Sequence, residues 1–512
     1  MPAAPRLPQG PAAQERMERI DTGVPNLDRV LGGGLLRGSI IMVIGPPGSG
    51  KTILAQQVAF RRAQLGEVSL YLTGYSETHD KLLRHNSALT YFDPAAIGRQ
   101  VQMGSLPDLL EHGAAEAEQV VVETARRQHA TLVVMDGFRS IRGFLPDDQA
   151  AAQFLYTVGA KLALLGATLL VLVEGDSEDR IRDPEQSVCD VILSLRRDFH
   201  RGGHHRLLEV LKVRGAAPLT GAHPFNIDSS GIRVYPRLES IVPDDQAPWT
   251  DKRHAFGVTW IDQLLGGGLN TGTSTLAAGT PGVGKTLLGL HFLAAGARSG
   301  EPGLLAGFVE SASQLRAKAR VFGMADVFDN PDGPVQLLTV PTHDLDADKV
   351  AWQIREAVEA RGVRRLVIDS VTELERGLAR AERAPMFLAA LAVYLRSAGV
   401  TTYFTVDVPT IVGQELSFAG TPLVAVAENL LLLRYAEYQG ELHRLFSILK
   451  MRFSDYDRTL REYTIRDGEG LRMEGPAPRA EGLLTGLARP LGGALGALRA
   501  SRDPASQSER QE

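Results

Sequence analysis

The stretch SIIMVIGPPGSGKTILAQQVAF, residues 39–60, joins an apolar run to a helical pattern through a glycine-rich turn. The run before the turn has the composition of a buried parallel strand, and the pattern after it repeats apolar residues at helical spacing. A strand, a G-x-x-x-x-G-K-[ST] motif and a helix in this order predict a phosphate-binding loop. The motif consists of Gly45, Pro46, Pro47, Gly48, Ser49, Gly50, Lys51 and Thr52.

The chemistry expected of this loop is the binding of a nucleoside triphosphate with Mg²⁺. Glycines let backbone N–H groups curl around phosphate oxygens, and the N-terminus of the following helix adds a partial positive charge. Lys51 would neutralise the β and γ phosphates, and Thr52 would offer its hydroxyl to Mg²⁺. The sequence therefore predicts ATP, or another purine triphosphate, and Mg²⁺ as the bound groups.

The chain repeats itself. The segment GVPNLDRVLGGGLLRGSIIMVIGPPGSGKT, which begins at Gly23, returns 234 residues later as GVTWIDQLLGGGLNTGTSTLAAGTPGVGKT. Self-similarity over most of a domain indicates duplication of the whole unit. The second loop consists of Gly279, Thr280, Pro281, Gly282, Val283, Gly284, Lys285 and Thr286.

Composition divides the chain into a flexible leader at 1–17, a first domain at 18–238, a linker at 239–252, a second domain at 253–473 and a flexible tail at 474–512. Apolar runs alternate with helical patterns inside each domain, which predicts an α/β fold with a mostly parallel sheet flanked by helices. The late segments VILSLRRD and HHRLLEVLKVRG indicate an antiparallel hairpin added to that sheet.

Bulk composition excludes several classes of protein. The 55 Lys and Arg residues against 60 Asp and Glu give a net charge of -5, which weighs against nucleic acid or an anionic membrane as partner. The longest apolar stretch is far shorter than a membrane span, prolines interrupt the N-terminus, and we expect a cytoplasmic protein. The one cysteine, Cys189, is expected to be a buried apolar side chain, and His200, His204 and His205 a solvated hairpin turn.

An aspartate ends one apolar run in each repeat. Asp136 follows TLVVM and Asp369 follows RRLVI. A carboxylate at the carboxyl end of a buried parallel strand lies beside the phosphate loop, where it can hold the water shell of Mg²⁺. A strand entering a turn would explain one such residue, but the repetition favours two metal sites that also use Thr52 and Thr286.

A glutamate follows the next strand in each repeat. Glu77 and Glu310 lie 26 and 25 residues beyond the loop lysines, where a carboxylate can reach the water that attacks the γ phosphate. The alternative is that these residues belong to a helix cap, because Thr78 and Ser311 also fit that position.

Each repeat also carries a Lys-x-Arg pair in a late strand. Lys212 and Arg214, like Lys450 and Arg452, are two residues apart and therefore point to the same face of a strand. Charges that guard an exposed sheet edge would explain a single pair. Repetition at the same place in both domains favours a functional role.

From Ile20 to Met473 the sequence resembles the KaiC family within the RecA-like ATPases. The resemblance rests on the LGGGL turns, the two loops, the strand ends LVVMD and LVIDS, and the late strands EVLKVRG and ILKMR. It implies two tandem RecA-like P-loop NTPase domains and a homo-oligomer, a double hexameric ring with ATP between subunits. It also implies that the two Lys-x-Arg pairs reach the γ phosphate held by the next subunit.

The sequence departs from the family pattern in two places. Two adjacent glutamates usually follow the strand after the loop, but this chain has Ser76 and Val309 at the first position. On a strand, a glutamate one residue later normally points to the opposite face, so Glu77 or Glu310 could replace the missing base only through a local twist. We expect no replacement at the Val309 site, where an apolar neighbour cannot orient water, and leave the Ser76 site open because a hydroxyl can. Clock members of the family phosphorylate adjacent Ser and Thr residues, whereas the matching positions here are Val424 and Ala425.

These features favour an ATP-binding and ATP-hydrolysing ring that signals to a regulatory protein partner, with slow turnover. Three other functions stay open. An assembly scaffold would bind ATP and barely hydrolyse it, an autokinase would use other hydroxyls as acceptors, and a DNA-handling relative would need basic loops that the acidic balance weighs against.

Overall fold

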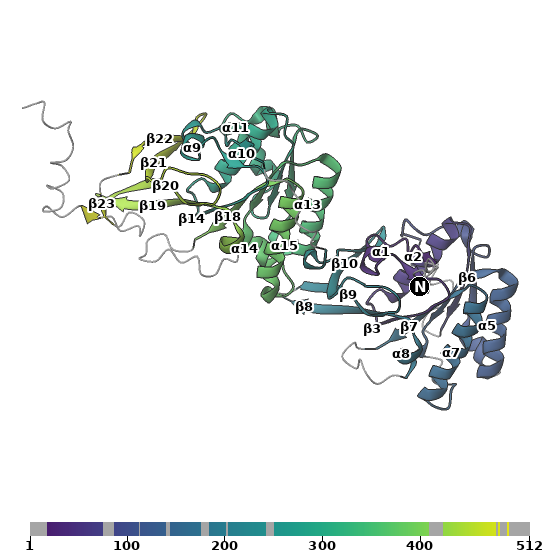
Figure 1. Ribbon diagram of the computed structural model, residues 1–512. Helices are drawn as coiled ribbons and strands as arrows, with labels where there is room; N and C mark the ends of the chain where they lie inside the picture. The colour runs from purple at the N-terminus through teal and green to yellow at the C-terminus, as the bar shows by residue number, and fades with distance from the viewer. Residues whose placement is uncertain are drawn as a thin grey trace, which may run out of the picture. The chain divides into compact units, whose positions relative to one another are not determined.

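The computed structural model describes residues 18–74, 87–111, 113–139, 144–175, 184–200, 203–241, 250–408, 423–477, 480–481 and 489–490. The chain separates into two compact units, Met1–Ser240 and Ile241–Glu512. Each unit is built on its own nine-stranded sheet (Figure 1).

The first unit begins with a two-stranded sheet of β1 (Arg19–Ile20) and β2 (Leu35–Leu36). Its central sheet has the order β11-β10-β9-β8-β3-β7-β6-β4-β5. The strands are β3 (Ile40–Gly45), β4 (Val68–Thr73), β5 (Val101–Ser105), β6 (Ala130–Asp136), β7 (Thr168–Glu174), β8 (Val191–His200), β9 (Gly203–Val213), β10 (Ala222–Asp228) and β11 (Gly231–Val234). The helices are α1 (Leu27–Val30), α2 (Lys51–Gln64), α4 (Leu106–Leu110), α5 (Ala114–Gln128), α7 (Asp148–Leu164) and α8 (Glu185–Val188).

The second unit repeats this plan, with the sheet order β16-β15-β17-β18-β14-β19-β20-β21-β22. Its strands are β12 (Arg253–His254), β13 (Leu269–Asn270), β14 (Ser274–Gly279), β15 (Gly303–Gly307), β16 (Val335–Thr339), β17 (Arg365–Asp369), β18 (Thr401–Asp407), β19 (Asn429–Tyr438), β20 (Glu441–Met451), β21 (Arg461–Arg466), β22 (Gly470–Pro476), β23 (Ala480–Glu481) and β24 (Arg489–Pro490). Its helices are α9 (Thr259–Leu264), α10 (Lys285–Arg298), α11 (Ala312–Val321), α12 (Ala325–Phe328), α13 (Ala347–Arg361), α14 (Val371–Arg376), α15 (Ala384–Ser397) and α16 (Leu423–Val426).

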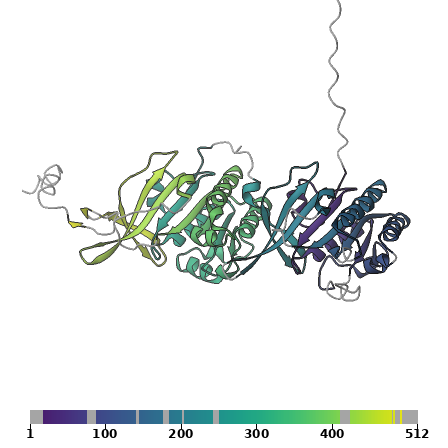
Figure 2. The same ribbon diagram turned by 90° about the horizontal axis from the view of Figure 1, so that it is seen from below.

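Helices cover both faces of the central sheet (Figures 1 and 2). Ile41 and Val43 of β3 pack in the cluster that includes α2, whereas Met42 and Ile44 pack in the cluster that includes α5 and α7. This alternation follows from the period of two along a strand. The all-apolar composition of β3 follows because both of its faces are buried. The predicted α/β fold with two tandem RecA-like domains is confirmed.

The sheet is extended by antiparallel strands at one edge. The predicted hairpin is present as β8 and β9, which pair from Val191 with Val213 to His200 with Gly203. The sequence did not predict β10 and β11, which continue the sheet beyond β9. Pro224 lies within β10 and lacks the N–H that a strand usually donates, which explains why this segment was missed.

An ion pair between a buried arginine and a partly buried glutamate lies at the start of β4 in the first unit and of β15 in the second, but its arginine comes from different elements. Arg62 of α2 donates through Nε to Glu67 Oε2 at 3.1 Å. In the second unit Arg365 of β17 donates through Nε to Glu301 Oε2 at 2.9 Å. Gly296 takes the place of Arg62 on α10, and a Cβ there would lie 2.4 Å from Arg365 Cδ. The two units therefore build the same pair in different ways.

The ends of the units differ in detail from the predicted boundaries. Strand β22 continues to Pro476, three residues beyond the expected end of the second domain, and in the tail β23 pairs with β24. The leader at 1–17 and residues 491–512 lie outside the described residues. Within the described part of the chain, no helix is both long and apolar enough to cross a bilayer.

Cys189 is fully buried at the end of α8, as predicted, and its Sγ lies 3.2 Å from Glu185 O. Burial raises the pKa of its thiol to about 12. His205 lies on β9, whereas residues 201–202 and the side chains of His200 and His204 are outside the described part.

Candidate nucleotide-binding sites

The two glycine-rich loops connect β3 to α2 and β14 to α10, as the sequence predicts. Gly50 and Gly284 precede the two helices with φ values of 106° and 100°, which favour glycine. A Cβ at Gly50 would lie 2.8 Å from Ile227 Cδ1, and one at Gly284 would lie 2.9 Å from Ile465 Cδ1. These isoleucines belong to β10 and β21, so the antiparallel extension of each sheet packs against its loop and supports it.

The lysine of each loop lies beneath the loop, with its amine directed at backbone carbonyls. Lys51 Nζ donates to Gly45 O at 2.8 Å and Pro46 O at 3.1 Å. Lys285 Nζ donates to Gly279 O at 2.8 Å and Thr280 O at 2.9 Å. Both lysine side chains are almost fully buried, so the backbone carbonyls hold each amine in one place beside its loop.

Two hydroxyls of the loops fit an anion. Ser49 Oγ and Thr280 Oγ1 are buried and have no hydrogen-bond partner within the described residues. A buried donor without an acceptor costs free energy, and phosphate oxygens would supply that acceptor. The loops therefore fit a bound phosphate by their own polar groups.

A second acidic residue lies beside each loop lysine, and the sequence analysis did not single it out. Asp407 ends β18 and its Oδ1 lies 2.9 Å from Lys285 Nζ. Glu174 ends β7 at the matching place in the first unit. Burial lowers the pKa of Lys51, and the charges of Glu174 and Asp136 oppose that shift.

The predicted metal-binding aspartates end β6 and β17, next to the loops. Asp369 Oδ2 accepts from Thr286 Oγ1 at 2.6 Å, and Asp369 Oδ1 accepts from Thr405 Oγ1. In the first unit Asp136 Oδ2 accepts instead from Tyr71 OH at 2.9 Å. Mg²⁺ prefers oxygen ligands, and in the second unit a carboxylate and the hydroxyl of the loop threonine lie in contact. This pair of groups fits the ion well.

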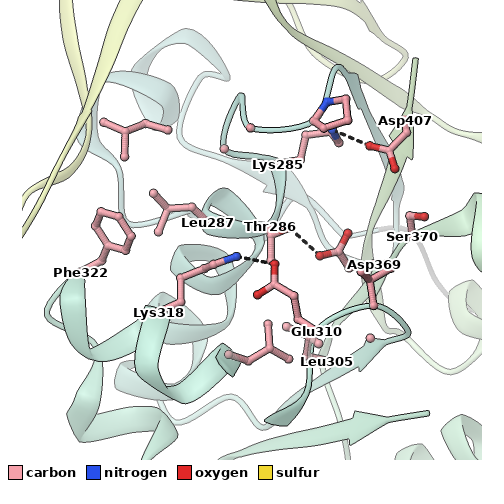
Figure 3. A pocket seen from close by; sticks show the side chains of 17 residues that line it. Lys285, Thr286, Leu287, Leu305, Glu310, Lys318, Phe322, Asp369, Ser370 and Asp407 are labelled. Carbon is pink, nitrogen blue, oxygen red and sulfur yellow. Dashed lines mark hydrogen bonds and ion pairs between the residues drawn. The ribbon is translucent and has the colours of Figure 1, made fainter. Parts of the chain in front are cut away.

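Each loop opens into a cavity, of about 620 Å³ in the first unit and about 440 Å³ in the second. The first is lined by Pro47, Gly48, Gly50, Lys51, Thr52, Ile53, Gln56, Thr73, Gly74, Leu89, Asp136, Gly137, Leu172, Glu174, Arg206 and Ile227. The second is lined by Pro281, Gly282, Gly284, Lys285, Thr286, Leu287, Leu305, Gly307, Val309, Glu310, Leu315, Lys318, Phe322, Asp369, Ser370, Asp407 and Ile465 (Figure 3). Both volumes suit a small-molecule ligand.

The premise that Val309 and Glu310 alternate along a strand is wrong. Strand β15 ends at Gly307, and the two residues lie in the bend that follows, where both line the cavity. Val309 is 73% exposed, and Glu310 Oε1 lies 2.5 Å from Lys318 Nζ. The bend permits both side chains to face one side, since the period of two applies only inside a strand. Ser76, Glu77 and Thr78 of the first unit lie outside the described residues.

The alternative role considered for Glu310 was a part in a helix cap, and the structure gives that role to the next residue, Ser311. Ser311 Oγ accepts from Gln314 N at 3.3 Å, and Gln314 Oε1 accepts from Ser311 N at 2.9 Å. This capping box begins α11. Because Ser311 performs the capping, the carboxylate of Glu310 is left to face the cavity.

The first strand of the antiparallel hairpin, β8 or β19, places one more side chain over the phosphate loop of its unit. The type of this residue differs between the two repeats. Arg197 of β8 reaches Gly48, since its Nη1 lies 3.4 Å from where a Cβ of that glycine would be. In the second unit Tyr435 of β19 takes this place and donates through its hydroxyl to Gly282 O at 3.1 Å. Repeat comparison could not find this position because the residue types do not match.

The Lys-x-Arg pairs lie away from the loops of their own units. Lys212 pairs with Ile192 near the start of β8, at the amino end of the parallel strands, and the loops lie at the carboxyl ends. Lys212 Nζ donates to Ser187 O at 3.2 Å, and Lys450 Nζ donates to Ala427 O at 2.7 Å. Strands β9 and β20 end one residue before the arginines.

Arg214 and Arg452 remain on the same side as the lysines, and both are exposed. Arg214 Nη1 lies 3.3 Å from Asp190 Oδ1, and Arg452 Nη2 donates to Ala425 O at 3.4 Å. Neither pair lines a cavity described above, so neither unit brings its own pair to its own loop.

Comparison with known proteins agrees with this geometry. A sequence model of the family described as "ATPase: KaiC" matches residues 20–239 and again 255–476. The chain is 26% identical over 495 residues to the circadian clock protein KaiC3 of Synechocystis sp. (strain ATCC 27184 / PCC 6803 / Kazusa), covering 92% of this chain and 94% of that protein. It is 25% identical over 469 residues to the circadian clock oscillator protein KaiC of Picosynechococcus sp. (strain ATCC 27264 / PCC 7002 / PR-6), covering 88% and 89%.

Proposed function

Because this chain belongs to the KaiC family of ATPases, we propose that it is a cytoplasmic ring protein that binds ATP at both loops and hydrolyses it slowly as a regulatory switch. The observation that carries this proposal is the second cavity, where a phosphate loop, Thr286, Asp369 and the loop lysine converge. An unidentified regulatory protein would read the nucleotide state of the ring.

Lys51 and Lys285 would bind the terminal phosphates, since each is the buried cation of its loop. Thr286 and Asp369 would hold Mg²⁺ in the second unit, and Thr52 and Asp136 in the first. When bound, the ion neutralises charge on the β and γ phosphates. These are positioning roles, which suit phosphoryl transfer because little covalent chemistry is required of the protein.

The Lys-x-Arg pairs suggest the assembly. Lys212, Arg214, Lys450 and Arg452 lie at the amino ends of the parallel strands, away from their own loops. We propose that the next subunit of a hexameric ring places its loop against them, so that the arginines stabilise charge on the transferring phosphoryl group in trans. ATP at such boundaries would favour assembly.

Slow turnover is proposed for the second domain because of its unusual water site. Val309 exposes an apolar side chain in the cavity at the position where the family carries a glutamate, and Glu310 is paired with Lys318. General-base assistance contributes roughly 10²–10⁴-fold to such reactions. Without it, hydrolysis would depend on positioning, Mg²⁺ and the trans arginines.

Phosphate release by the full chain with ATP and Mg²⁺ tests this function. Val309→Glu is expected to raise the rate, Val309→Gln serves as the control without a charge, and Glu310→Gln should change the rate little. The increase should vanish when Lys285→Ala is added, because it arises in the second domain. Rapid wild-type hydrolysis that collapses in Glu310→Gln would identify Glu310 as an unrestrained base and contradict the proposal.

Three outcomes would redirect the proposal. ATP binding and ring assembly without phosphate release would indicate a scaffold. Stoichiometric transfer of phosphate to a hydroxyl of the chain would indicate an autokinase, for which positions 424 and 425 offer no acceptor. Turnover that requires DNA would restore the DNA-handling function.

A further inference from the structure

An ion pair occupies the interior of the second nucleotide cavity. Lys318 Nζ lies 2.5 Å from Glu310 Oε1, and the two side chains are 31% and 32% exposed. Both residues line the same cavity as Lys285, Thr286 and Asp369, and Figure 3 shows Lys318 directed at Glu310. The cavity therefore contains a second lysine in addition to that of the loop.

Helix α11 directs this lysine into the cavity. Leu315, Lys318 and Phe322 are spaced so that they share one side of the helix, and all three line the cavity. The Cα–Cβ bonds of a helix lean toward its N-terminus, which lets Lys318 reach back to the bend that contains Glu310. The capping box at Ser311 fixes where the helix begins and so fixes this distance.

The other carboxylates of the cavity have different partners. Asp407 is paired with Lys285, and Asp369 accepts hydrogen bonds from the hydroxyls of Thr286 and Thr405. Glu310 is the remaining acidic side chain of the cavity lining, and Lys318 is its ion-pair partner among the described residues. Lys318 therefore forms its ion pair with Glu310 and makes no ion pair with the other two carboxylates that the structure describes in the cavity.

We propose that Lys318 is a positioning residue that holds Glu310 in this ion pair and thereby restrains ATP hydrolysis by the second domain. The inference rests on the proposed ATPase activity. In hydrolysis the water oxygen bonds to the γ phosphorus, the bond to the β–γ bridging oxygen breaks, and ADP leaves with that electron pair. The base takes the water's proton, and a carboxylate whose Oε1 is held by the ammonium of Lys318 is less available to approach that water.

The partial exposure of the pair sets the size of the restraint. Coupling within a solvent-accessible ion pair is small, which corresponds to a restraint of roughly two- to fivefold. Full general-base assistance would be much larger. The ion pair is thus one of two causes of slow turnover, and the apolar Val309 is the other.

The test compares steady-state phosphate release by variants of the full chain. Lys318→Met removes the charge and keeps the length, and it is expected to raise kcat about two- to fivefold with KM for ATP unchanged. Lys318→Arg should keep the slow rate because it keeps the pair. Lys318→Met combined with Glu310→Gln should lose the increase. Arg320→Met is the matched control, since Arg320 pairs with Asp329 outside the cavity.

Each alternative result overturns the inference. A lower kcat or a raised KM in Lys318→Met would mean that the lysine acts on the nucleotide, and an increase that survives Glu310→Gln would mean that it does not act through the glutamate. Lys318→Gln replaces the methionine variant if that variant fails to assemble. If the wild type releases phosphate and Lys318→Met releases it at the same rate, the restraint is refuted and the ATPase proposal stands. Absence of release from every variant, Val309→Glu included, refutes the ATPase proposal together with it.

Discussion

Replacing the loop lysine of the second domain separates the two nucleotide sites. Lys285 Nζ contacts Gly279 O, Thr280 O and Asp407 Oδ1 within 3 Å, and its side chain is 6% exposed. In Lys285→Ala the terminal phosphates would lose this cation, and Asp407 would be left facing them with its negative charge. The loop of the first domain, with Lys51, would be unchanged.

The contacts give the expected loss of affinity. A hydrogen bond to a charged group contributes about 1.5–3 kcal/mol, which corresponds to about 10- to 150-fold in Kd. Repulsion from Asp407 adds about 1 kcal/mol at contact distance in a water-like medium. The double variant Lys285→Ala/Asp407→Asn should therefore recover part of the loss, about fivefold.

Calorimetric titration with Mg²⁺ and a slowly hydrolysed ATP analogue measures both quantities. The wild-type chain should show two sites, Lys285→Ala and Lys51→Ala one strong site each, and Lys349→Ala two, since Lys349 lies on α13 and outside both cavity linings. A single stoichiometric site in the wild type would refute equal repeats. Two undiminished sites in Lys285→Ala would refute the role of the lysine.

Three further predictions follow from the same structure. Mixed rings of Arg452→Ala and Lys285→Ala chains should regain second-domain phosphate release, because each chain supplies what the other lacks across a boundary; assembly without complementation would refute the trans assignment. Labelled ATP followed by peptide mapping should find no stoichiometric phosphate on Ser417 or Thr421, which lie outside the described residues, and labelling there would favour a kinase. Burial lowers the pKa of His291 to about 4, so its contribution to stability is present above its ordinary value near 6.5 and is lost as pH falls toward 4. Between pH 7 and pH 5 the unfolding temperature of the wild type should therefore fall more than that of His291→Leu. Equal changes of unfolding temperature with pH in the two proteins would contradict this prediction.

Much of the fold was predictable because its signals are local. The loop, its flanking strand and its helix are contiguous in sequence, and the apolar composition of β3 reflects burial on both faces. Duplication strengthened each signal. Glu174 ends the apolar run TLLVLV, and Asp407 ends the buried β-rich run TTYFTV. Both residues therefore carried a signal similar to that of Asp136 and Asp369 and could have been found by it.

Other features of the sites depend on where a strand stops or on contacts distant in sequence. Strand β15 ends at Gly307, so Val309 and Glu310 escape the alternation that a longer strand would impose. A boundary error of three residues was enough to assign them to opposite faces. Arg197 and Tyr435 occupy matching places with different chemistry, and the pairing of Lys318 with Glu310 depends on how α11 begins.

The arginine that pairs with the glutamate before β4 or β15 comes from α2 in the first unit and from β17 in the second. This difference limits how the two halves of the gene can recombine. Counting back from Asp136 and Asp369, Arg365 of β17 matches Leu132 of β6, just as Gly296 matches Arg62. A hybrid with α2 and β17 would bring two guanidinium groups to one glutamate, in space that holds one. A hybrid with α10 and β6 would lose both of these arginines and leave the glutamate with its other ion pair, to Arg37 in the first unit or Lys252 in the second. Exchange of a short tract between the repeats would therefore disturb this ion pair unless the helix and the strand were exchanged together.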